Sequence, residues 1–538
     1  MRTPVSQLLV LGLATLAPLA LLAAENKPAA APKTDGPKAE APKFAVEQQS
    51  SKGTVTVGGR RIDYDAVAGT LIVHAKDWDD VPQNADPEAK EPPAEASMFY
   101  VAYFATGERK TPRPVTFFFN GGPGSSTVWL HMGAFGPKRI VTADDTHTPA
   151  APYGIVNNDY SLLDVSDLVF VDAPGTGFSR IAGKEREKAF YGVDPDAHAF
   201  ADFITQFLSK YSRWNSPKYI FGESYGTTRS AALANLLQTG HSVDLNGVIL
   251  LSQILMFDGS ADGPESNPGI DVPYQLALPT YAATAWYHHK LPGPARELPA
   301  LLAEVEHFAM HEYAEALQAG GELPADRRQA IAQQLHLYTG LPVDYLVKAN
   351  LRISGGVFEK ALQDEAGLTT GRLDSRFSGA TFDPLSKEAA YDPQSAAISS
   401  AYVSAFNDYA RTELKVSPER QFKSEIDIWR TWNFLHQPPD APIPLPQAAN
   451  VLPDLAAAMK YNPDLKVMVN GGYYDLATPY YEAKYEMRHL PIPDNLRKNI
   501  EFRFYESGHM IYAHEPSAKA LHDNVADFIR RSDNIAAH

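Results

Sequence analysis

A serine in the middle of the chain has the local sequence of an activated nucleophile. Ser224 is the centre of "GESYG", residues 222–226. The apolar run "KYIF" precedes this stretch, and Leu233, Leu236 and Leu237 follow it at helical spacing. Gly-x-Ser-x-Gly between a strand and a helix is the pattern of a nucleophile elbow, a turn sharp enough to expose the serine. We therefore predict that Ser224 is a nucleophile.

A serine hydroxyl needs a base to take its proton, and later residues provide the candidates. Asp475 comes just after the apolar run "KVMV", and His509 comes just after "FRFY". The order serine, acid, histidine is typical of enzymes with this elbow. We predict that His509 is the general base and then the acid, while Asp475 holds its tautomer and stabilises the imidazolium. Other histidines lack a strand-end setting, among them His131, His288 and His289.

A glycine-rich loop earlier in the chain could supply the remaining part of such a site. The run "VTFFF" at 115–119 ends in "NGGPGSST". Acyl transfer requires backbone N–H groups directed at the developing oxyanion. We predict that the amides of Gly122 and Tyr225 form this oxyanion hole. A phosphate-binding loop is the rival interpretation, but no Gly-Lys-Ser/Thr follows the glycines.

Apolar runs alternate with helical stretches from about residue 115 onward. Five short runs stand out because each ends in an unusual loop: "VTFFF" at 115, "LVFV" at 168, "KYIF" at 218, "KVMV" at 466 and "FRFY" at 502. The alternation predicts an α/β fold with a mostly parallel central sheet flanked by helices. Sites in such sheets assemble beyond the carboxyl ends of the strands, which is where all five loops would lie.

The remaining segments suggest a division of the chain. Residues 1–24 have a charged start, a short apolar core and small residues, so we expect a signal peptide and an exported protein, periplasmic or secreted. Residues 25–44 have the Ala/Pro/Lys-rich composition of a disordered tether. We expect the first part of the core at 45–294, beginning with hairpin strands, and its second part at 436–538. The helical periodicity of 295–435 predicts an inserted cap over the sheet.

Composition excludes some classes of partner. The chain has 538 residues, 44% of them hydrophobic, which is ample for a large core. A net charge of −16 argues against nucleic acid. A membrane anchor is the rival interpretation of the N-terminal apolar run, but that run is short for a spanning helix, and no other stretch is long and apolar enough for one. Cysteine is absent, so stability must come from the core, and nothing in the sequence indicates an oligomeric state.

Taken together, the motifs resemble those of one enzyme family. "NGGPGSS", "DAPGTGFS", "GESYG", "GGYYD" and "GHM" follow in order, and the set is similar to the serine carboxypeptidases of the α/β-hydrolase superfamily. The resemblance implies release of C-terminal residues from peptides through an acyl-enzyme, without metal or cofactor. It also implies that Asn120, Gly121 and Glu223 hold the substrate's terminal carboxylate. We expect a bacterial, exported member.

The chain departs from the family pattern at several positions. Phe118 and Phe119 replace Trp and Leu before the glycine-rich loop, and Ser125 replaces Cys. A family glutamate that supports carboxylate binding aligns with Ala134. That loss favours one alternative, an esterase or acyltransferase that uses the same triad. A second alternative is a peptide-binding protein without catalysis, against which the intact triad argues.

Overall fold

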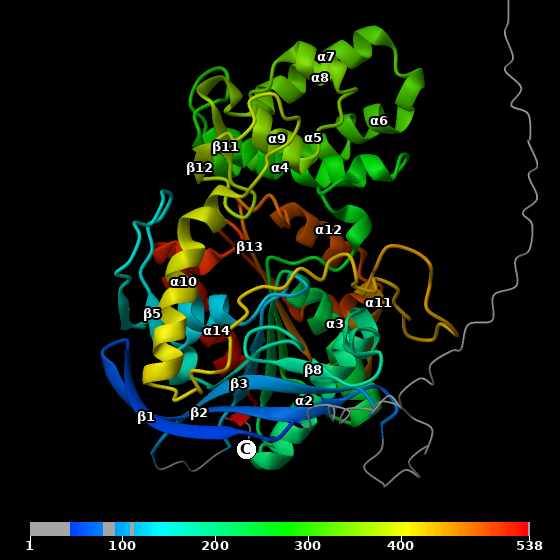
Figure 1. The fold of residues 1–538 in the computed structure, drawn as a ribbon. Coiled ribbons are helices and arrows are strands. Elements are labelled where there is room, and N and C mark those ends of the chain that lie inside the picture. The colour runs from blue at the N-terminus through cyan, green and yellow to red at the C-terminus, as the bar shows by residue number, and fades with distance from the viewer. Residues whose placement is uncertain (1–43, 79–91, 108–111, 536–538) are drawn as a thin grey trace, which may run out of the picture. The chain divides into compact units, whose positions relative to one another are not determined.

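A long twisted sheet runs through the part of the chain that the computed structural model describes, residues 44–78, 92–107 and 112–535 (Figure 1). The order of its strands is β1-β2-β3-β7-β4-β9-β10-β13-β14, with β8 paired to β3. Its members are β1 (Gln48–Val57), β2 (Arg60–His74), β3 (Glu95–Ala105), β4 (Val115–Phe119), β7 (Asp167–Val171), β8 (Arg180–Ala182), β9 (Lys218–Glu223), β10 (Gly247–Leu251), β13 (Lys466–Gly472) and β14 (Ile500–Tyr505).

The sheet combines an antiparallel and a parallel part. β1, β2 and β3 pair antiparallel, and β3 also pairs antiparallel with β7. From β7 to β14 every neighbouring pair is parallel. The predicted mostly parallel sheet is thereby confirmed, and each of the five apolar runs lies in a strand. Because parallel neighbours end at the same edge, the loops after β4, β9, β13 and β14 meet there.

Both faces of the sheet are buried, because successive side chains of a strand point to opposite faces and each face is covered. Phe117 and Phe119 belong to one buried cluster, whereas Phe118 belongs to the other. The first cluster includes residues of α2 (Val193–Lys210), α3 (Tyr225–His241), α11 (Leu452–Tyr461) and α12 (Tyr480–His489). The second includes residues of α10 (Pro393–Thr412) and α14 (Glu515–Ser532). Helices on both faces explain why the central strands are continuous apolar runs rather than alternating ones.

A separate group of helices has a core of its own. It consists of α4 (Val272–Tyr287), α5 (Leu298–Met310), α6 (Glu312–Ala319), α7 (Ala325–Thr339), α8 (Val343–Lys348) and α9 (Gly355–Ala361). This helical cluster begins before residue 295. α10 is not part of this group. Its apolar face packs on the sheet instead, where Ala401, Tyr402 and Phe406 are buried in the second cluster. The division at 295 and 435 stays a prediction.

Two pairs of short strands and several small elements complete the described chain. β11 (Leu368–Thr370) and β12 (Ser378–Ala380) pair antiparallel, as do β5 (Lys138–Ile140) and β6 (Ile155–Asn157). A single π-helical turn covers Leu130–Phe135. The expected signal peptide at 1–24 and nearly all of the tether at 25–44 lie outside the described residues. Within the residues that are described, no helix combines the length and the apolar character needed to cross a bilayer.

Candidate active site

Ser224 occupies the sharp turn between β9 and α3, as the sequence predicts. Its backbone has φ 60° and ψ −130°, a conformation that costs energy for a residue with a side chain. The amide of Ser224 donates to the carbonyl of Leu251 at 2.9 Å, which fixes the turn to β10. The side chain is partly exposed, and its hydroxyl makes no hydrogen bond to another described residue. The turn thus presents a hydroxyl at the carboxyl edge of the sheet.

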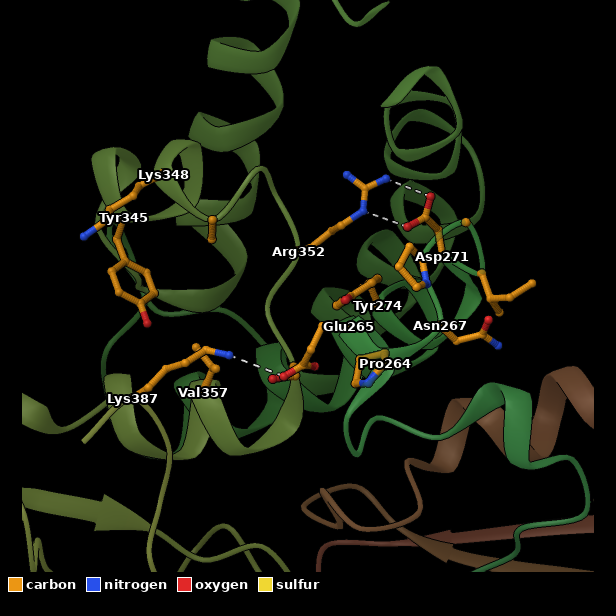
Figure 2. Close-up of a pocket in the computed structure, with 15 residues that line it drawn as sticks. Pro264, Glu265, Asn267, Asp271, Tyr274, Tyr345, Lys348, Arg352, Val357 and Lys387 are labelled. Carbon is orange, nitrogen blue, oxygen red and sulfur yellow. Dashed lines mark hydrogen bonds and ion pairs between the residues drawn. The ribbon is translucent and has the colours of Figure 1, made fainter. Parts of the chain in front are cut away.

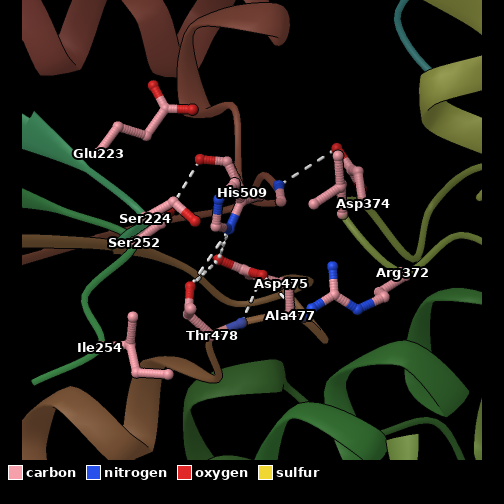
Figure 3. Close-up of polar contacts among 12 residues, drawn as sticks. Glu223, Ser224, Ser252, Ile254, Arg372, Asp374, Asp475, Ala477, Thr478 and His509 are labelled. Atoms are coloured by element: carbon pink, nitrogen blue, oxygen red, sulfur yellow. Dashed lines mark hydrogen bonds and ion pairs between the residues drawn. The ribbon is translucent and has the colours of Figure 1, made fainter. Parts of the chain in front are cut away.

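Asp475 and His509 are brought together by the loops after β13 and β14. His509 Nδ1 lies 2.8 Å from Asp475 Oδ2 (Figure 3). The same carboxylate accepts the amides of Ala477 and Thr478 at 2.9 and 3.0 Å and the Thr478 hydroxyl at 2.7 Å. Burial lowers the pKa of His509, but the charge of Asp475 and its hydrogen bond, aided by Glu223, outweigh burial and raise that pKa. The imidazolium is therefore stabilised.

The glycine-rich loop after β4 lies directly against the elbow. A Cβ atom on Gly121 would lie 2.4 Å from the nitrogen of Tyr225, so only glycine permits this approach. Gly122 has φ +105°, which also favours glycine. In the described part of the chain, neither the amide of Gly122 nor that of Tyr225 donates a backbone hydrogen bond outside regular elements. Two donors are thus available near the serine, while the oxyanion hole itself stays a prediction.

Ser224, His509 and the glycine-rich loop line one cavity of about 300 Å³. Asn120, Gly121 and Glu223 line it as well. The second half of the expected cap adds further lining residues, namely Arg372, Leu373, Ser395, Ile398, Ser399, Glu425 and Ile426. The structure therefore gathers six of the eight residues proposed from the sequence around one space. Asp475 is fully buried against His509, and Tyr225, which is also buried, is the first residue of α3 after the serine.

Glu223 is a buried carboxyl group next to the proposed nucleophile. The Tyr512 hydroxyl donates to both of its oxygens, at 3.1 and 2.8 Å. Burial raises the pKa of Glu223 to about 7, although His509, Tyr512 and Asn120 favour the charged form and lower it. Near neutral pH this group can therefore hold a proton and donate a hydrogen bond.

Two further residues of the predicted carboxylate-binding region have defined roles in the packing. Asn120 Oδ1 accepts the amide of Leu130 at 3.2 Å, and its backbone carbonyl accepts from buried Arg229 at 2.8 Å. Ala134 lies in the π-helical turn, where its carbonyl accepts from Asn158 Nδ2 at 2.8 Å. Its methyl side chain is buried and offers Glu223 no polar partner. Tyr512 makes the contact with Glu223 instead.

Several contributors to the site escaped prediction from the sequence. Thr478 and Tyr512 follow the predicted Asp475 and His509 by three residues each, so their closeness to the motifs was a usable signal. β10 and the following Ser252 were missed, although the run "GVILL" has the composition of a buried strand. Ser252 Oγ donates to the carbonyl of His509 at 2.8 Å.

A larger cavity, of about 670 Å³, lies between the helical cluster and the loop before α4 and contains none of the predicted site residues (Figure 2). Most of its charged groups are already paired. Arg352 donates to both oxygens of Asp271 at 2.7 and 2.8 Å, and Lys387 lies 3.3 Å from Glu265. Across the described residues, no group of three or more histidine and carboxylate side chains is arranged to hold a metal ion.

Comparisons with known proteins agree with the geometry. Residues 89–288 match the family described as serine carboxypeptidase. A pheromone-processing carboxypeptidase KEX1 of Yarrowia lipolytica is 33% identical over 143 residues, covering 26% of this chain and 22% of that protein. Serine carboxypeptidase-like 47 of Arabidopsis thaliana is 30% identical over 149 residues, covering 27% of each. The matched region thus spans about a quarter of the length of these relatives.

A solved structure extends the likeness to most of the chain. The crystal structure of Kex1Δp, a prohormone-processing carboxypeptidase from Saccharomyces cerevisiae, superposes with a TM-score of 0.52. It covers 87% of this chain and 91% of that one at 14% identity, which shows a common fold. The resemblance drawn from the motifs is confirmed: the chain has the α/β-hydrolase fold, and over residues 89–288 it matches the serine carboxypeptidase family.

Proposed function

We propose that this protein is a serine carboxypeptidase that releases C-terminal residues from peptides. The observation that carries the proposal is the content of the smaller cavity, where Ser224, His509 and the buried carboxyl of Glu223 line the same space. A nucleophile with its base can cleave many esters and amides. A neighbouring carboxyl group that holds a proton at neutral pH adds the means to recognise a free C-terminus.

The proposed reaction proceeds in two stages. Ser224 Oγ attacks the carbonyl carbon of the last peptide bond while His509 takes the hydroxyl proton. The C–N bond then breaks, and His509 returns the proton to the leaving amine, so that the released residue departs and an ester remains on the serine. Water, deprotonated by His509, cleaves this ester and regenerates the hydroxyl. Asp475 stabilises the imidazolium in both stages, and the amides of Gly122 and Tyr225 bind the oxyanion.

The same geometry supports a role for three residues in substrate binding. Asn120, Gly121 and Glu223 all line the cavity, and Glu223 directly precedes the serine. A neutral Glu223 can donate its proton in a hydrogen bond to the substrate's carboxylate, whereas an ionised one would repel it. No metal or cofactor takes part in this scheme. The substrates are peptides, and we place the enzyme outside the cytoplasm, periplasmic or secreted, on the N-terminal sequence alone.

An esterase or acyltransferase is the second candidate, and Ala134 is the observation that favours it. The residue leaves Glu223 without the carboxylate neighbour expected from the family pattern. The two candidates differ in what they require of a substrate. We expect rapid release of single residues from peptides with a free C-terminus and much slower cleavage of the same peptides as C-terminal amides. Mass spectrometry of timed digests measures both, and equal rates on the two sets would rule out the carboxypeptidase.

A further inference from the structure

The hairpin loop between β11 and β12 crosses both catalytic loops. The carbonyl of Leu373 accepts the amide of His509 at 2.6 Å, and the carbonyl of Arg372 accepts the amide of Leu476 at 3.0 Å. The amide of Ser375 donates to the carbonyl of Tyr474 at 2.9 Å. Residues 372–375 thus contact the backbone on both sides of Asp475 and that of His509 itself. These contacts are not part of the strand pairing of the main sheet, since β11 and β12 form a separate two-stranded sheet.

Asp374 adds a side-chain contact to the same junction. Its Oδ2 accepts the amide of Gly508, the residue before His509, at 3.1 Å (Figure 3). A Cβ atom on Gly508 would lie 2.4 Å from both the Asp374 Cβ and the Leu373 carbonyl oxygen, so the two loops are in direct contact. Asp374 is fully buried, and Arg376 donates to it through Nε at 3.0 Å and a terminal nitrogen at 2.6 Å.

The hairpin loop is fixed on its other side by the helical cluster. Ser375 Oγ lies 2.6 Å from Thr284 Oγ1 in α4, and the Ser375 carbonyl lies 2.6 Å from His288 Nε2 just after that helix. The loop therefore connects α4 to the two catalytic loops. His509 is held from both sides, because Ser252 after β10 binds its carbonyl while Leu373 binds its amide.

A buried ion pair is a poor way to gain stability alone. Removing Asp374 and Arg376 from water is costly, and the attraction between them often does no more than offset that cost. Such pairs are better attested as devices that fix one arrangement among several. Here the arrangement that would be fixed is the spacing of His509 from Asp475, since each of the four contacts ends within one residue of them.

We propose that the hairpin loop at 372–375 holds the Asp475 and His509 loops in register, with Asp374 as the positioning residue for His509. The inference rests on the proposed function, in which these two residues act as a pair. Asp374 does not touch a substrate or the reacting atoms in this scheme. It acts through the backbone of Gly508, and it makes the catalytic pair dependent on a segment that is far from the sheet in sequence.

The pKa of His509 depends on how close the histidine lies to Asp475, so a change in that pKa would reveal a displacement. Burial and, to a smaller extent, Arg372 lower its pKa, whereas Asp475 and Glu223 raise it. If the histidine loop shifts away from Asp475, the largest favourable contribution weakens and the pKa falls. The acid limb of activity should then move to lower pH. If the Asp374 contact served only stability, its loss would reduce the amount of native enzyme but leave the midpoint of the acid limb unchanged.

The decisive experiment replaces Asp374 in the full-length protein. For Asp374→Ala we expect kcat to fall about 10- to 100-fold per native molecule, with little change in KM, because a displacement of about 1 Å costs that much. We also expect the pH midpoint of fluorophosphonate labelling to fall. Asp374→Asn keeps an oxygen that can accept from Gly508, so its loss should be smaller. The native fraction is measured by near-UV circular dichroism.

A matched control and a reference variant separate this inference from its premise. Asp271→Asn alters a similar aspartate–arginine pair in the larger cavity and should leave the labelling midpoint unchanged. If the wild type fails to label, or Ser224→Ala still labels, the proposed function is wrong. If both behave as expected and Asp374→Ala retains the wild-type kcat and midpoint, only the positioning role is wrong. Loss of the native spectrum in Asp374→Asn would also overturn it, because the residue would then serve stability.

Discussion

The two cavities differ in a way that volume does not reveal. The larger, about 670 Å³, lies beside the helical cluster, and the smaller, about 300 Å³, lies at the carboxyl edge of the sheet. Around the larger cavity, Arg352 and Lys387 are matched by carboxylates within ordinary ion-pair distance. In the smaller cavity, burial shifts the pKa of Glu223 to about 7 and Asp475 raises that of His509. Shifted protonation in a cleft indicates chemistry better than size does.

The helical segments around the expected cap also fall into two groups, one beside each cavity. The helices α4–α9 pack around their own core and contribute no residue to the smaller cavity. The second half, which contains the hairpin loop and α10, packs on the sheet and provides one wall of that cavity. The difference suggests that helical periodicity alone cannot identify a cap that covers a site. What matters is which apolar cluster a helix joins.

The strongest test of this comparison removes the proposed nucleophile. Ser224→Ala should lower kcat by about four orders of magnitude or more, because members of a triad act as a unit. The fold should survive, since the hydroxyl contributes no hydrogen bond to the described structure. Peptide turnover and the thermal unfolding midpoint measure the two effects. Near-normal turnover would show that the smaller cavity is not the active site.

A variant of the larger cavity provides the counterpart. Lys348 lines that cavity and is exposed. Lys348→Ala should leave kcat/KM close to that of the wild type, because a surface substitution without buried partners usually changes the free energy of unfolding by no more than about 0.5 kcal/mol and this residue does not line the smaller cavity. If it lowered turnover as much as Ser224→Ala, the assignment of chemistry to the smaller cavity would be wrong.

A second test uses the protonation of Glu223. Below about pH 7 the group is neutral and can donate to a substrate carboxylate; above that pH it ionises and repels it. KM for free-acid peptides should therefore rise above pH 7, by up to about tenfold per pH unit. His509 has the opposite influence on kcat, since a base must lose its proton to act. KM and kcat measured separately over pH distinguish the two groups.

The control for that test is Glu223→Gln, which cannot ionise. Its amide donates a hydrogen bond at any pH, so KM for free-acid peptides should become nearly independent of pH. Ester and amide substrates without a free carboxylate should lack the trend in both enzymes. A flat KM profile in the wild type would exclude Glu223 from carboxylate recognition.

The sequence alone predicted the residues of the candidate site that follow strands of the sheet. Ser224, Asp475 and His509 each follow a short apolar run, and local patterns reveal both the runs and the turns after them. Asp374 could not be found in this way. It lies 101 positions before Asp475 in a segment with no catalytic motif, and only the tertiary fold brings it to Gly508. Tyr512 is an intermediate case, because its position near His509 was visible but its hydrogen bonds to Glu223 were not.

The smallest expected effect tests how finely Tyr512 adjusts Glu223. The hydroxyl of Tyr512 donates to both carboxylate oxygens and so favours the charged form. Tyr512→Phe removes this stabilisation, so the pKa of Glu223 should rise, and the increase of KM for free-acid peptides should begin at higher pH. At low pH, where Glu223 is neutral in both enzymes, kcat should change little.

Tyr402→Phe is the matched control for this variant. Tyr402 is buried near the same carboxyl group, but its hydroxyl forms no hydrogen bond with Glu223 among the described contacts. Its removal should leave the onset of the KM increase close to that of the wild type. An onset that moves to lower pH in Tyr512→Phe, or moves equally in both variants, would mean that Tyr512 fills space beside Glu223 rather than setting its charge.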